Sequence, residues 1–193
     1  MRMIIIMLCW CCLFTAQAHC ADGGHPFPQC LGPVCLQDIW ADAEPFFERY
    51  GKGLADEGKF PVYLYTTPEG VWVKIERYHG ENRPINFIAV SVYPLADRAS
   101  PPPDVPFPAL ETEQGIGLGA SFEAVMKAYG KPNYLKQNVA SYSSYIPKSW
   151  AGATHGKLLI ADYRESEEDL CKEFVVVFED GVAVLMVLTA PPG

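Results

Sequence analysis

Two short segments of the chain repeat apolar residues at the spacing of one helix face. In each segment the apolar side chains fall at positions i, i+3, i+4 and i+7, which are Ala43, Phe46, Phe47 and Tyr50 in one and Phe122, Val125, Met126 and Tyr129 in the other. Asp42 and Ser121 precede the segments as N-caps, and Gly51 and Gly130 follow them as C-caps. The pattern predicts two amphipathic helices whose aromatic stripes pack into a core.

After each predicted helix the pattern changes to the alternation and β-branched content of strands. The predicted strands cover residues 60–66, 71–77 and 85–93 after the first helix, and 140–146, 157–163, 173–179 and 182–189 after the second. Glu69-Gly70 and Asp180-Gly181 supply hairpin turns between neighbouring strands. Each half of the chain is therefore predicted to be a helix on one face of an antiparallel sheet.

The two helical segments also match each other as sequences. Residues 41–52 and 120–131 are identical at 5 of 12 positions without a gap. The repeat predicts an α+β fold of two tandem helix-on-antiparallel-sheet modules, one at 19–94 and one at 111–193. The linker at 95–110 is rich in proline, which favours an extended connection.

The N-terminal segment has the three parts of a secretion signal. Arg2 is followed by an apolar run at 4–14 and then by Ala16-Gln17-Ala18, whose small residues suit a signal peptidase. This run of 11 residues is shorter than the roughly 20 needed to span a bilayer. We expect a signal peptide at 1–18, cleavage after Ala18, and a mature chain that is periplasmic or secreted.

Four cysteines remain after that cleavage, namely Cys20, Cys30, Cys35 and Cys171. In an exported chain they suggest two disulfides, for which three connectivities exist. Cys30 can pair with Cys35, because Gly32-Pro33 between them can turn the chain, and Cys20 then pairs with Cys171. The alternative pairs Cys20 with Cys30 and Cys35 with Cys171.

A longer stretch around the second helix carries a family resemblance. Residues 115–132, which run from Gly115-Ile-Gly-Leu-Gly119 to Gly130-Lys-Pro132, and the later Phe178-Glu-Asp-Gly-Val182 resemble the helical hairpin plus sheet module of the SmpA/OmlA lipoproteins. Two copies in one exported chain are similar to the architecture of the β-lactamase inhibitory proteins. The likeness is stronger over 115–190 than over 31–93. It implies a protein that binds another protein through a sheet face and its loops.

The residues offer little catalytic or metal-binding chemistry. Lys plus Arg is 15 and Asp plus Glu is 23, and the resulting net charge of −8 disfavours sequence-independent nucleic-acid binding. Ser121 lacks the surroundings of a catalytic nucleophile, so we expect no enzyme, no cofactor and no metal. A new N-terminal His19 could chelate copper together with His25, although a solvated terminus is the simpler interpretation.

Side-chain parity along 71–77 separates an apolar set of residues from a polar one. Trp72, Lys74 and Glu76 alternate with the apolar residues that face the helix, so they are predicted on the free face of the sheet. The aromatic residues expected to join them are Tyr63, Tyr65, Tyr142 and Trp150. Such a mixture of aromatic and charged side chains is typical of protein-binding surfaces. The alternative is that these aromatic residues meet one another as a minor core.

We therefore predict an exported, non-catalytic protein-binding module, either an inhibitor or an immunity-type protein, that acts through its sheet face. Removal of the signal leaves a net charge of −9, which favours a basic partner, and this partner could be an enzyme. The mature chain is predicted to have no membrane span and no nucleic-acid partner. The alternative function is a structural protein that supports envelope assembly or cell-wall integrity without one tight partner.

Overall fold

The computed structural model describes seven parts of the chain, which are residues 26–38, 62–77, 84–96, 108–137, 150, 156–165 and 172–191. These parts contain nine β-strands and the helix α2. The signal peptide, the predicted helix at 42–50 and the predicted strand at 140–146 lie outside the described residues and stay predictions. The module boundaries stay predictions as well.

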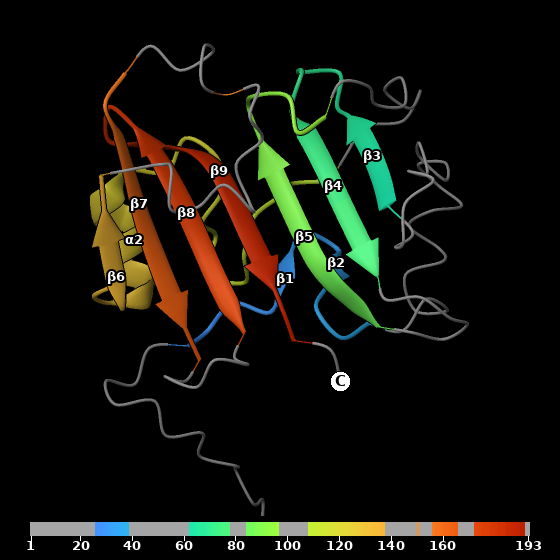
Figure 1. Ribbon diagram of the computed structural model, residues 1–193, viewed down its shortest axis with the longest axis horizontal. Coiled ribbons are helices and arrows are strands. Elements are labelled where there is room, and N and C mark those ends of the chain that lie inside the picture. The colour runs from blue at the N-terminus through green and yellow to red at the C-terminus, as the bar shows by residue number, and fades with distance from the viewer. Residues whose placement is uncertain are drawn as a thin grey trace, which may run out of the picture.

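Seven of the strands form one antiparallel sheet with the order β3-β4-β5-β9-β8-β7-β6 (Figure 1). The strands are β3 (Val62–Thr66), β4 (Trp72–Arg77), β5 (Ile85–Ser91), β6 (Tyr134–Lys136), β7 (Leu158–Arg164), β8 (Glu173–Glu179) and β9 (Val182–Thr189). Six of the seven predicted strands are confirmed to within two residues. The short β6 was not predicted.

The prediction of two helix-on-sheet modules is wrong, because the described chain is a β-rich fold with one continuous sheet and one helix. Two three-stranded meanders, β3-β4-β5 and β7-β8-β9, meet where β5 pairs with β9. That pairing runs from Phe87↔Thr189 to Ser91↔Leu185. Both strands are largely buried there, so an unpaired edge on either strand would leave backbone polar groups without partners. Hydrophobic alternation along the chain predicts where strands form. It does not predict which strands pair with each other, such as β5 with β9.

The two predicted hairpin turns are confirmed. Asp180 and Gly181, between β8 and β9, have φ angles of 49° and 88°, and a type I′ turn requires positive φ at both central residues. Gly70, between β3 and β4, has a φ angle of 84°, and its N–H donates to the carbonyl of Thr67 at 2.9 Å. These turns set the strand register on both sides of the sheet.

Helix α2 (Phe122–Tyr129) is confirmed together with both of its predicted caps. The Ser121 hydroxyl accepts a hydrogen bond from the Ala124 N–H at 3.1 Å. At the other end Gly130 has a φ angle of 74° and donates its N–H to the Met126 carbonyl at 2.8 Å. The helix lies on one face of the sheet beside β6 and β7 (Figure 1), and we call this face the α2 face.

A small hairpin near the N-terminus packs on the same face. It consists of β1 (Cys30–Leu31) and β2 (Val34–Cys35), and Leu31 and Val34 are buried in the same core as α2. A disulfide joins Cys30 to Cys35, which confirms that pairing and excludes the alternative that joined each of them to a different cysteine. Cys20 and Cys171 lie outside the described residues, so their predicted bond stays a prediction.

Each face of the sheet has its own buried core. The core of the α2 face is rich in aromatic residues, namely Tyr63, Tyr65, Tyr129, Tyr163, Phe174 and Phe178. The core of the opposite face is built mainly from aliphatic residues, among them Val62, Leu64, Ala89, Val175, Val177, Leu185 and Val187, with Trp150. Aromatic and charged side chains such as Trp72 and Lys74 lie next to each other on the opposite face, and the candidate site is placed there.

Candidate protein-binding surface

Three of the predicted binding residues are brought together on the opposite face. Trp72, Lys74 and Glu76 alternate along β4 and are half-buried. Phe87 on β5 is the cross-strand partner of Glu76, and Lys74 Nζ lies 5.2 Å from the centroid of its ring. Lys74 and Glu76 also form an ion pair. We call these four residues, Trp72, Lys74, Glu76 and Phe87, the β4–β5 patch.

Small residues beside the β4–β5 patch make its larger side chains prominent. Ser91 is the cross-strand partner of Trp72, and Ala89 is the cross-strand partner of Lys74. Both partners are buried, with at most 1% of their surface exposed. Trp72 and Lys74 therefore extend beyond the neighbouring strand and keep part of their surface accessible. Phe87 was missed by sequence reasoning, although it has the odd-numbered parity that the β4–β5 register assigns to this face.

Tyr63 and Tyr65 do not belong to the β4–β5 patch, so the parity predicted for them is wrong. The register pairs Tyr63 with Ile75 and Tyr65 with Val73, which places both tyrosines on the α2 face. They are 9% and 0% exposed, and burial raises the pKa of each hydroxyl above its ordinary value. The face was predicted wrongly because tyrosines at two alternate positions of a strand are typical of an amphipathic surface. Here the two tyrosines belong to an aromatic core instead.

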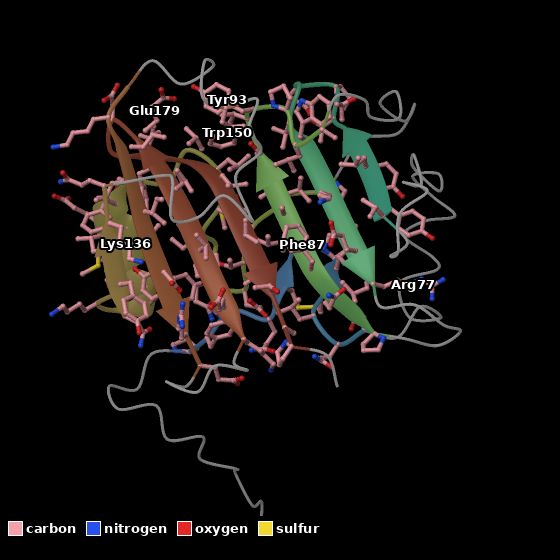
Figure 2. The ribbon with its side chains drawn as sticks, viewed as in Figure 1. Arg77, Phe87, Tyr93, Lys136, Trp150 and Glu179 are labelled. Carbon is pink, nitrogen blue, oxygen red and sulfur yellow. A yellow bond between two sulfur atoms is a disulfide. The ribbon has the colours of Figure 1, made fainter. Side chains whose placement is uncertain are left out.

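Trp150 is on the opposite face but is a packing residue, since only 2% of it is exposed. Its Nε1–H donates to the Pro94 carbonyl at 3.1 Å, and its ring centroid lies 4.9 Å from that of Tyr93 in an edge-on contact. The Tyr93 hydroxyl donates to Glu179, and this bond raises the pKa of Tyr93. Figure 2 shows Tyr93, Trp150 and Glu179 gathered at one end of the sheet.

Tyr142 lies outside the described residues. So do His19 and His25, and within the described chain no three His, Cys, Asp or Glu side chains gather as a metal site would require. α2, the one described helix, has eight residues and is too short to cross a bilayer.

A second group of charged side chains lies on the opposite face near β6, and buried aliphatic residues of β8 and β9 separate it from the β4–β5 patch. Asp162 on β7 is fully buried, and Arg164 Nη2 lies 3.2 Å from Asp162 Oδ2 and 3.1 Å from Glu173 Oε1. The Arg164 guanidinium also lies 4.7 Å from the centroid of the Tyr134 ring. The single positive charge of Arg164 is thus shared between two carboxylates, and its guanidinium lies against an aromatic ring at the β6 side of the sheet.

A separate hollow of about 270 Å³ lies between the β3–β4 turn and the segment 108–118. Its walls include the apolar Val71, Leu110 and Leu118 and two carboxylates, Glu69 and Glu111. A hydrogen bond from the Thr67 hydroxyl lowers the pKa of Glu69 below its ordinary value. The hollow could accept an aliphatic side chain that ends in a positive charge.

The chain was compared with protein-family models, with curated proteins and with solved structures, and none of the three comparisons found a match. The function is therefore argued from the geometry of the β4–β5 patch.

Proposed function

We propose that this chain is an exported protein-binding module that recognises its partner through the β4–β5 patch. The observation that carries the proposal is the juxtaposition of Trp72 and Phe87 with the Lys74–Glu76 ion pair, all half-buried on one sheet face. Aromatic side chains supply large apolar contact area at low entropic cost, and flanking charges fix orientation. A rigid sheet beneath them adds pre-organisation, which reduces the cost of binding.

Two further observations support an exported binding role. The Cys30–Cys35 disulfide is compatible with an oxidising compartment such as the periplasm or the extracellular space. The excess of acidic residues favours a basic partner and speeds encounter with it at low salt. Within this proposal the partner is a toxic or secreted enzyme, and the chain acts as its inhibitor or immunity protein.

Capture and a measured affinity test the proposal together. Tagged mature chain is used to capture partners from a periplasmic extract, and the binding of the purified partner is then measured by calorimetry. The double variant Trp72→Ala/Phe87→Ala is expected to weaken the affinity about 100-fold or more, because two aromatic contacts are lost. Lys157→Ala, an exposed cation outside the patch, is the matched control and is expected to leave the affinity unchanged.

Two results would count against the proposal. An unchanged affinity in the double variant, with circular dichroism showing a folded chain, would place the interface elsewhere. A chain that stays monomeric and unbound in extracts, yet is needed for envelope integrity, would favour the structural envelope role instead.

A further inference from the structure

Strand β6 ends the sheet opposite to β3, and in the described chain β7 is its one neighbour. Its three residues pair with β7 as Tyr134↔Asp162, Leu135↔Ala161 and Lys136↔Ile160, and all three are exposed. Tyr134 is 44% exposed and Leu135 is 52% exposed, so apolar surface is open on both faces of the strand. The outer edge of β6 combines these side chains with backbone groups that face away from β7.

The chain segment that contains β6 is basic, although the chain as a whole is acidic. Residues 127–137 contain Lys127, Lys131 and Lys136 and no Asp or Glu. Lys127 and Lys131 are exposed and make no ion pair within the described chain. Lys136, labelled in Figure 2, has its Nζ 5.6 Å from the Tyr134 ring centroid, so its charge lies beside the exposed aromatic side chain. Three positive charges therefore lie along the segment that leads into β6 and forms it.

We propose that β6 binds an extended, acidic segment of another protein, which adds a strand to the sheet. Main-chain hydrogen bonds supply part of the affinity in this mode, and alternate side chains supply the specificity. Tyr134 and Leu135 give apolar contacts on the two faces, and the lysines give cross-strand ion pairs with carboxylates of the added strand. A second copy of this chain fits poorly, because pairing β6 with β6 brings two lysine-containing segments of like charge together.

This surface is independent of the proposed function, because the β4–β5 patch lies at the other side of the sheet. The two surfaces also differ in the charge of the partner that each is proposed to bind. The chain as a whole attracts a basic partner, whereas the β6 edge selects an acidic segment. One binding partner could meet both surfaces only if it carried an acidic strand within a basic body.

Nuclear magnetic resonance titration tests the proposal. Isotope-labelled mature chain is titrated with a capped peptide of alternating glutamate and valine, and in parallel with the matched peptide of alternating lysine and valine. Saturable amide shifts are expected at residues 134–136 and 160–162 with the glutamate peptide alone. The double variant Lys131→Glu/Lys136→Glu is expected to weaken that binding about tenfold, because attraction becomes repulsion at two exposed positions. Lys157→Glu, which reverses an exposed charge outside β6, is expected to retain the affinity within about threefold.

Three outcomes would overturn the proposal: equal shifts with the two peptides, shifts confined to other regions, or affinity unchanged in Lys131→Glu/Lys136→Glu. Broadening at β6 that grows with protein concentration without peptide would indicate self-pairing, which contradicts the charge argument. Trp72→Ala/Phe87→Ala is expected to leave the titration unchanged, so failure of the β4–β5 patch and failure of the β6 edge are told apart.

Discussion

The two faces of the sheet are built by alternate residues of the same strands, yet they differ in chemistry. On the α2 face the strand positions are apolar, and the helix, the β1–β2 hairpin and aromatic side chains seal them. On the opposite face the apolar core is bordered by Lys74, Glu76, Asp162, Arg164 and Glu173. Both faces bury an apolar core that stabilises the fold, and the opposite face adds charged and half-buried aromatic side chains at the borders of its core.

The two faces are expected to differ most in the loss of stability on mutation, and the largest loss is expected for a substitution of Phe174. Its side chain is fully buried on the α2 face, and its ring centroid lies 5.1 Å from that of Tyr129. Phe174→Ala is expected to lower the free energy of unfolding by about 3–5 kcal/mol, because it removes a large ring and leaves a cavity. Trp72→Ala, on the opposite face, is expected to cost less, about 1 kcal/mol, because Trp72 is only half-buried. Urea unfolding followed by circular dichroism measures both.

Equal costs for these two variants would show that the opposite face is as tightly sealed as the α2 face. Trp72 would then be a core packing residue, and the proposed binding role of the β4–β5 patch would be contradicted.

The next effect concerns the hairpin that helps to seal the α2 face. The Cys30–Cys35 bond closes a short loop, with a sequence separation of 5 residues. The double variant Cys30→Ser/Cys35→Ser is expected to lower the free energy of unfolding by about 2 kcal/mol, because the unfolded chain gains conformational freedom. A matched comparison is the wild-type chain with and without a reducing agent. A reduced wild type as stable as the oxidised chain would contradict the expectation.

The difference between the faces also explains which features were predictable from the sequence. Helix α2 and its caps were predictable because Ser121, Gly130 and the apolar stripe are local signals that act within one element. The Asp180-Gly181 turn was predictable for the same reason. Strict alternation along β4 places Trp72, Lys74 and Glu76 on one face, as predicted, whereas the predicted helix at 42–50 that was expected to cover the other face lies outside the described residues.

Features that depend on pairing between distant segments were not predictable. The junction of β5 with β9 depends on residues about 100 positions apart, and no local pattern encodes it. Tyr63 and Tyr65 were misplaced because the parity of β3 is known only once its register with β4 is known. β6 has three exposed residues, too few for alternation to be recognised.

Alkaline pH is expected to weaken the α2 face selectively. The Tyr129 hydroxyl lies 2.5 Å from Thr112 Oγ1 and 2.6 Å from Gln114 Oε1, and burial raises the pKa of Tyr129 to about 12. The folded pKa exceeds the ordinary value of 10.0, so this stabilisation is complete below pH 10 and is lost as the pH rises toward 12. At a pH midway between these values Tyr129 is expected to account for a loss of about 1 kcal/mol.

Urea unfolding across this pH range measures the loss. Tyr129→Phe is the matched variant, because it keeps the ring and removes the titrating hydroxyl. It is expected to be less stable at neutral pH, through its lost hydrogen bonds, and to show a shallower decline above pH 10. The same decline in both proteins would assign the alkaline loss to other groups.

The smallest effect is expected at the cap of the helix that covers the α2 face. The Ser121 hydroxyl accepts the Ala124 N–H at an exposed site, so Ser121→Ala is expected to cost about 0.5–1 kcal/mol and Ser121→Gly only a few tenths. Hydrogen exchange locates the effect, because weakening of α2 should speed amide exchange in residues 122–129 before it affects the β4–β5 patch. Faster exchange at Trp72 and Lys74 to the same degree would mean that the two faces unfold as one unit, and that the helix stabilises the β4–β5 patch as much as its own core.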